Sequence, residues 1–160
     1  MPEIPGDKNE PTDGAVLRSH GALLLASEVA AEAHQGQLDK TGQPYFSHCQ
    51  RVANAVDGMD AKVVAYLHDV LEKGPGWSAR RLLEKGFDPV IVGAVVALTK
   101  EPAESEAAFV RRAASNALAL PVKGADLLDN LEQALASGME THKYLDGLRI
   151  LEAEYGYHSD

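Results

Sequence analysis

Two otherwise apolar segments of the sequence carry side chains that bind metal ions or move protons. His68 and Asp69 interrupt the run AYLHDVLEK, and Glu72 follows one helical turn after His68. In a continuous helix, His68 and Glu72 share a face because residues four apart are neighbours. That face borders an apolar stripe formed by Val63, Leu67 and Val70. A charge at the edge of a core requires an opposite charge or a metal ion.

Further polar residues extend this set. Asp126 and Asn130 are four residues apart beside the apolar stripe of a late helix, and His48 lies near the start of another helix. His48, His68, Asp69 and Asp126 together offer two imidazoles and two carboxylates, which suit Mn²⁺, Fe²⁺ or Zn²⁺ with coordination positions left for water. Water bound to such an ion becomes a usable hydroxide near neutral pH. The spacing alone also fits ordinary surface residues, because His-Asp dipeptides often arise by chance.

The composition limits the class of protein. A chain of 160 residues with 45% hydrophobic content suits one domain with one core. The net charge of −9 is spread along the chain, which disfavours nucleic-acid binding but leaves a small anionic ligand open. The single cysteine excludes an intrachain disulfide and favours a cytoplasmic protein. No apolar run approaches ~18 residues, so no membrane-spanning helix and no membrane partner are expected.

The segments that must position these residues read as helices almost throughout. We predict an all-α fold of seven or eight short helices in one domain over residues 14–160, after a flexible tail over residues 1–13. Ser78 and Asp88 are typical N-cap residues, and Gly138 is a typical helix stop. The predicted helical segments are 15–36, 47–56, 61–72, 79–86, 88–100, 103–116, 121–138 and 141–156.

Four stretches resemble a known family: AHQGQLDKTGQPYFSH, LHDVLEK, ALTK and VKGADLLDNL. They occur in the family's order over roughly residues 20–135. The chain resembles HD-domain phosphohydrolases and, among them, the (p)ppGpp 3'-pyrophosphohydrolase domain of Rel/Spo-type proteins and the small alarmone hydrolases.

The resemblance implies roles for individual residues. His48, His68, Asp69 and Asp126 would bind one divalent ion, with Mn²⁺ first and Fe²⁺, Zn²⁺, Co²⁺, Ni²⁺ or Mg²⁺ as alternatives. Glu72 would join Asp69 in catalysis as the acid that activates the attacking water. The substrate pocket would be lined by Lys40, Tyr45 and Asn130.

The chain departs from the family at three places. The family carries an acidic pair where this chain has Glu72-Lys73, and basic residues where it has Leu38-Asp39. Gly124 replaces a usual Leu. Lys73 allows two interpretations: an ion pair with Asp69 four residues earlier, or a point charge that binds a substrate phosphate.

Three residues allow a structural as well as a functional interpretation. His34 ends the first helix, where a cation suits the helix dipole, but it also lies near the pocket segment. Asp129 is either a surface neighbour of the site or a support for it. Cys49 is either a small buried filler or a reactive thiol.

The sequence therefore favours a metal-dependent hydrolase of a small nucleotide, with (p)ppGpp-type substrates first. One alternative keeps the metal and changes the substrate to a nucleoside monophosphate or another phosphomonoester, because the Leu38-Asp39 segment differs from the family. Another is a catalytically silent sensor of metal and nucleotide, because Lys73 stands where the family has an acid. Assembly into a homo-oligomer stays open.

Overall fold

The structure of the protein is a computed structural model, which describes residues 13–158. These residues form nine helices, and their only β pairing is an isolated bridge between Leu38 and Pro44. The all-α prediction is confirmed; the predicted tail lies outside the described residues except for Asp13. The helices are α1 (Asp13–Ala33), α2 (Tyr45–Ala55), α3 (Met59–Leu67), α4 (Val70–Lys73), α5 (Ala79–Glu84), α6 (Pro89–Ala97), α7 (Glu106–Ala114), α8 (Ala119–Ser137) and α9 (His142–Tyr155).

Local sequence signals set several helix ends. The Ser78 hydroxyl accepts a hydrogen bond from the backbone N–H three residues later, and the Asp88 carboxylate accepts one from two residues later. Gly138 ends α8 in the left-handed conformation, with φ of 66°. These residues provide the side-chain acceptors and the left-handed cap that free helix ends require, as the sequence predicts.

The predicted helix over residues 61–72 is interrupted. α3 ends at Leu67 and α4 begins at Val70, and Asp69 has φ and ψ of −107° and 1°, outside the helical region. The prediction of one continuous helix is therefore wrong, and so is the prediction that His68 and Glu72 share a helix face. The interruption lies at the His68–Asp69 pair itself.

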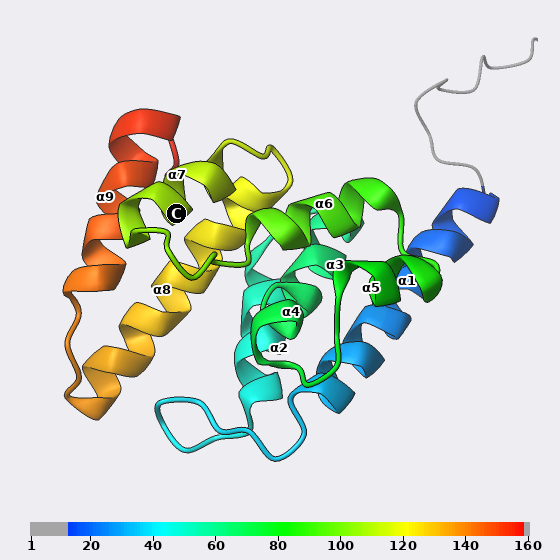
Figure 1. Cartoon of the computed structure of the whole chain (residues 1–160), viewed down its shortest axis with the longest axis horizontal. Coiled ribbons are helices and arrows are strands. Elements are labelled where there is room, and N and C mark those ends of the chain that lie inside the picture. Colours follow the sequence, from blue (N-terminus) through cyan, green and yellow to red (C-terminus); the bar gives the residue numbers. More distant parts are fainter. Residues whose placement is uncertain (1–12, 159–160) are drawn as a thin grey trace, which may run out of the picture.

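The core has two parts that meet at α8. The larger part contains buried residues of α1 to α6 together with Val122 and Ala125 of α8. The smaller part joins α7, α8 and α9 around Val110, Leu127 and Leu151. Figure 1 shows α7, α8 and α9 on one side of the molecule, next to the helices that precede them. Among the described helices, none combines the length and the apolar character needed to cross a membrane.

Candidate metal centre

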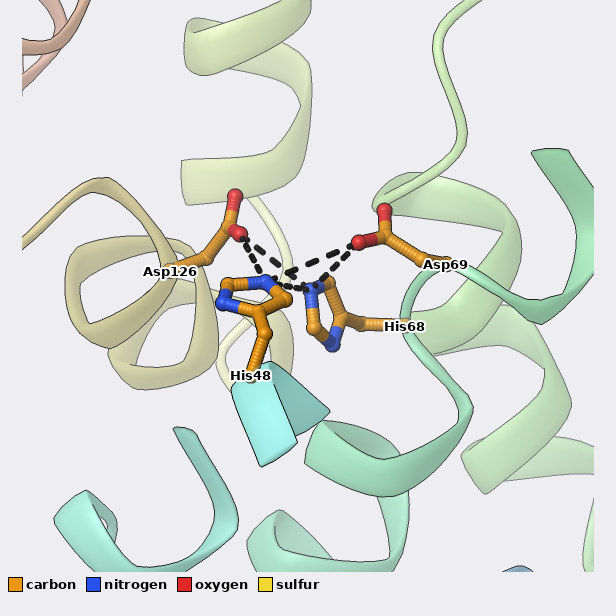
Figure 2. Close-up of side chains that lie close together, drawn as sticks. All are labelled: His48, His68, Asp69 and Asp126. Atoms are coloured by element: carbon orange, nitrogen blue, oxygen red, sulfur yellow. Dashed lines mark hydrogen bonds and ion pairs between the residues drawn. The ribbon is translucent and has the colours of Figure 1, made fainter. Parts of the chain in front are cut away.

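Four buried side chains from three parts of the chain converge on one point (Figure 2). His48 comes from α2, His68 and Asp69 from the α3–α4 break, and Asp126 from α8. One ligand atom from each lies within 4.8 Å of all the others. The structure thus brings together all four residues that the sequence predicts as metal ligands.

The spacing of these atoms fits a single ion. His48 Nε2 lies 3.2 Å from His68 Nε2 and 3.1 Å from Asp126 Oδ1. His68 Nε2 lies 3.2 Å from Asp126 Oδ1 and 3.0 Å from Asp69 Oδ2. Neighbouring ligands of an octahedral ion, each bound at about 2.1 Å, are about 3 Å apart. These four pairs are therefore spaced like neighbouring corners of one coordination shell, while His48 Nε2 and Asp69 Oδ2 lie 3.7 Å apart.

Hydrogen bonds on the far side of each imidazole turn its Nε2 lone pair toward this centre. His68 Nδ1 lies 2.5 Å from the carbonyl oxygen of Ala65, which only accepts, so Nδ1 carries the proton. His48 Nδ1 lies 2.6 Å from Asp129 Oδ2 and donates in the same way. When both rings are neutral, the Nε2 lone pairs of His48 and His68 point toward each other and toward the carboxylates of Asp69 and Asp126. A divalent cation resolves this repulsion, so the donor set fits a metal ion.

The electrostatics of the cluster also favour a cation. Burial opposes protonation of His68, but the Asp69 and Asp126 carboxylates outweigh it and raise its pKa well above the usual value. Burial likewise opposes ionisation of Asp126, but Lys123 and the two histidines outweigh it and lower its pKa. Burial also opposes ionisation of Asp69, but His68 outweighs it and lowers the pKa of that carboxyl group. Both carboxylates therefore stay ionised at neutral pH.

The cluster borders a pocket of about 230 Å³. Asp69 and Asp126 line it on the side of the cluster, and Glu106 and Phe109 of α7 are among the residues that line the rest. Five of the seven lysines among residues 13–158 also line this pocket, which is a high local density of cations for a protein of net charge −9. These lysines are Lys40, Lys73, Lys100, Lys123 and Lys143.

The predicted substrate residues lie in this pocket and contact the ligands. Tyr45 donates its phenol hydrogen to Asp69 Oδ2 over 2.5 Å. Lys40 Nζ donates to Asn130 Oδ1 over 2.5 Å, and Asn130 Nδ2 donates to Asp126 Oδ1 over 2.9 Å. Lys40, Tyr45 and Asn130 are therefore each one or two hydrogen bonds from a candidate metal ligand.

Glu72 and Lys73 both line the pocket, although they are exposed. No hydrogen bond or ion pair joins the Glu72 carboxylate to another described residue, so this side chain faces the pocket without a partner there. Lys73 Nζ lies 4.9 Å from the centre of the Tyr45 ring. In the described chain, no ion pair joins Lys73 to Asp69, and the exposed ammonium group lies at the pocket wall.

Several pocket residues escape sequence reasoning because tertiary packing alone brings them near. Glu106 Oε1 lies 2.6 Å from Lys100 Nζ and 3.6 Å from Lys143 Nζ, which joins the end of α6 to α7 and α9. Lys123 Nζ lies 3.4 Å from Asp126 Oδ2. Lys123 has the clearest signal, because it precedes Asp126 by three residues in an apolar run, and Lys100 ends the ALTK stretch.

His34 and Cys49 are buried behind the pocket. Burial lowers the pKa of His34, so a cationic helix-capping role does not fit. Its Nδ1 lies 2.9 Å from Gln37 Oε1, and its ring centre lies 4.8 Å from that of Tyr45. Cys49 is fully buried, and burial raises its thiol pKa to about 12, as expected for a filler and not for a reactive group.

Comparison with known proteins gives a family and a fold. Residues 26–120 match the family model of the HD domain. Among solved structures, the chain is similar to a metazoan ortholog of SpoT that hydrolyzes ppGpp and plays a role in starvation responses. That likeness has 24% sequence identity, a TM-score of 0.66 and 88% coverage of each chain, and it establishes a shared fold. No curated protein matches the sequence.

The matched segment spans more than half of the chain and contains three members of the cluster, His48, His68 and Asp69. The fourth, Asp126, follows shortly after it on α8 and lies against the other three. On the match over residues 26–120, the chain belongs to the HD domain family.

Proposed function

We propose that this protein is a metal-dependent phosphohydrolase that acts on a small nucleotide. The observation that carries the proposal is the position of the four-residue cluster at the wall of a pocket lined by five lysines. Hydrolysis of a phosphate ester needs an activated water, and it needs positive charges that bind the anionic oxygens of the substrate. A mixed histidine and carboxylate cluster beside several ammonium groups meets both needs.

The ligand set in this proposal is His48, His68, Asp69 and Asp126, and the proposed ion is Mn²⁺. When bound, the ion supplies a water of lowered pKa and polarises a phosphoryl oxygen. Tyr45 keeps Asp69 in place through its hydrogen bond to Oδ2. Asn130 does the same for Asp126 through its bond to Oδ1.

Glu72 is the proposed general base. Its carboxylate lies at the pocket without a partner among the described residues, so it can accept the proton of the attacking water. The water oxygen then forms a bond to phosphorus, and the bond from phosphorus to the leaving oxygen breaks. Lys40 and Lys73 hold the other phosphoryl oxygens as positive charges at the pocket wall.

A (p)ppGpp-type nucleotide is the first proposed substrate. The structurally similar metazoan ortholog of SpoT hydrolyzes ppGpp, which supports this assignment. Two diphosphate arms also suit a pocket whose lysines come from different segments: Lys40 and Lys73 precede α5, whereas Lys100 and Lys143 follow α6.

A phosphomonoester is the second candidate, and the loop at Asp39 favours it. The Asp39 carboxylate accepts hydrogen bonds from Thr41, Gln43 and Arg51, so it is engaged within the protein. Leu38 offers the pocket an apolar side chain in place of a cation. Apart from Lys40, which is assigned to phosphate in this proposal, the loop therefore offers the pocket no free charge that would distinguish guanine.

The test is turnover of a nucleotide panel by the Mn²⁺-loaded protein, with ppGpp, nucleoside monophosphates and simple phosphomonoesters as substrates. Asp69→Ala should lower kcat by about 10²-fold or more, because it removes both a ligand and the Tyr45 contact. Asp60→Ala, an exposed acid at the start of α3, is the matched control and should retain activity. The ranking of ppGpp against the monophosphates decides between the two substrates. Tight nucleotide binding without turnover would instead identify a sensor.

A further inference from the structure

Another buried carboxylate, Asp129, lies behind His48 and outside the four-residue cluster. Its Oδ2 accepts hydrogen bonds from His48 Nδ1 over 2.6 Å and from Gln133 Nε2 over 2.7 Å. Arg51 Nε donates to its Oδ1 over 2.7 Å, and Arg51 Nη2 donates to its Oδ2 over 3.1 Å. Asp129 thus receives four donors from three side chains while it is only 8% exposed.

Two of these three side chains continue to the loop that forms one wall of the pocket. Arg51 Nη2 also donates to Asp39 Oδ2 over 3.1 Å. Gln133 Oε1 accepts a hydrogen bond from the backbone N–H of Lys40 over 3.1 Å. Two parallel connections therefore run from the backbone and side chains of the pocket loop, through Asp129, to the ring of His48.

Asp39, the residue of the pocket loop that Arg51 contacts, also holds the loop itself together. Asp39 Oδ1 accepts hydrogen bonds from the Thr41 backbone over 2.9 Å, the Thr41 hydroxyl over 2.7 Å and the Gln43 backbone over 3.0 Å. Lys40, which lines the pocket, stands inside this turn. A shift of Asp39 relative to Arg51 would therefore move Lys40 as well.

The two histidines of the cluster differ in what holds them. A neutral carbonyl stands behind His68, and a carboxylate stands behind His48. A carboxylate behind a ligating histidine fixes its ring and makes it a stronger donor to a metal ion. Loss of Asp129 would leave the buried Nδ1 of His48 with only Gln133 near it, at 3.3 Å.

We propose that Asp129 is a positioning residue for His48, and that Arg51 and Gln133 tie the pocket loop around Lys40 to the same carboxylate. This rests on the proposed metal site. Metal affinity and substrate affinity then depend on one shared hydrogen-bond network.

The test measures Mn²⁺ affinity by titration calorimetry in the absence of any substrate. Asp129→Ala should weaken Mn²⁺ binding about 10- to 100-fold. Asp129→Asn keeps an oxygen acceptor and should lose less, which separates the loss of charge from the loss of the contact. Bound Co²⁺ gives a second readout, because its visible absorption changes when His48 is displaced. A role in folding alone would lower the melting temperature and leave the affinity and the spectrum unchanged.

Arg51→Met tests the connection to the loop. It should weaken Mn²⁺ binding several-fold and raise KM for a phosphate ester, with a smaller effect on kcat. Arg80→Met is the matched control, since Arg80 is exposed and pairs only with Glu84, and neither quantity should change. Wild-type Mn²⁺ affinity in folded Asp129→Ala or Asp129→Asn protein would overturn the proposal, as would failure of the wild-type protein to bind Mn²⁺ or Co²⁺. Wild-type protein that binds Mn²⁺ but hydrolyses nothing would overturn the proposed function and leave the positioning role supported.

Discussion

Gly74, which directly follows α4, is closed in on three sides. A Cβ atom added there would lie 2.6 Å from the carbonyl oxygen of Val70, 2.8 Å from Cβ of Ala33 and 2.9 Å from Cδ1 of Trp77. The first of these atoms is backbone and the second is fixed to the backbone of α1, so no side-chain rotation relieves the contacts. The backbone angles of Gly74, φ −86° and ψ 113°, suit any residue, so the conflict is steric only.

Gly74→Ala should therefore destabilise the protein by overpacking, which costs about 1–3 kcal/mol. For a chain of this size, that lowers the melting temperature by about 2–4 °C per kcal/mol. Gly93 provides the matched control, because it lies inside α6 and an added Cβ would meet no atom within 4 Å. Gly93→Ala should stabilise the protein by about 0.5–1 kcal/mol, the helix preference of Ala over Gly.

The two variants are compared with the wild type by urea unfolding and by differential scanning calorimetry. Opposite signs of the change in unfolding free energy are expected for the same chemical change. If Gly74→Ala unfolds with the wild-type midpoint, the packing of α4 against α1 is looser than the contacts around Gly74 indicate, and the reasoning fails. Because Lys73 precedes Gly74, a displaced α4 should also raise KM for the substrate.

Three further predictions follow from side chains near and away from the pocket. Lys73→Asp should raise KM for a phosphate ester at least about fivefold, since an exposed charge contributes about 1 kcal/mol; an unchanged KM would mean that its ammonium does not bind phosphate. The Cys49 thiol, with its pKa near 12, should stay unmodified by a thiol reagent at pH 8 until the protein unfolds, and rapid labelling of native protein would contradict its burial. Arg112 lowers the pKa of Glu104 from 4.5 to about 2, so the ion pair stabilises the fold above pH 4.5 and is lost as pH falls toward 2. Arg112→Met should accordingly differ most from the wild type near neutral pH in urea unfolding, and a pH-independent difference would refute the assignment.

The helices were predictable where a local signal marks their ends. Ser78, Asp88 and Gly138 supply hydrogen bonds or a left-handed turn within a few residues, so short-range chemistry is sufficient. The break at His68–Asp69 carries no such signal. Val63, Leu67 and Val70 keep a helical period across it, which is why one continuous helix is predicted.

That break has a physical reason that lies outside the local sequence. Adjacent residues of a continuous helix point about 100° apart and do not face each other. With the helix interrupted, His68 Nε2 and Asp69 Oδ2 come within 3.0 Å of each other. The bonds that accompany this geometry involve Asp126 and Tyr45, which are distant in the sequence. The family resemblance identified the four clustered residues, but only the fold reveals how neighbouring residues reach one point.

The remaining pocket residues depend on the packing of α7 and α9. Lys100 and Lys143 are separated by more than 40 residues and share Glu106. Lys100 ends the ALTK stretch and Lys143 lies in none of the four family-like stretches, so the spacing of the two lysines carries no signal. Their position follows from tertiary contacts, which a pattern of residues along the chain does not describe.

The placement of α8 between two cores has a consequence for how such a protein evolves. Three of the four clustered residues belong to the half packed in the larger core, and Asp126 lies on the shared helix. Glu106, Phe109 and Lys143, which also line the pocket, belong to α7 and α9. Substitutions in those two helices can therefore change the lining of the pocket while the four clustered residues stay the same. On the proposed function, such substitutions change the choice of substrate and leave the ligand set in place.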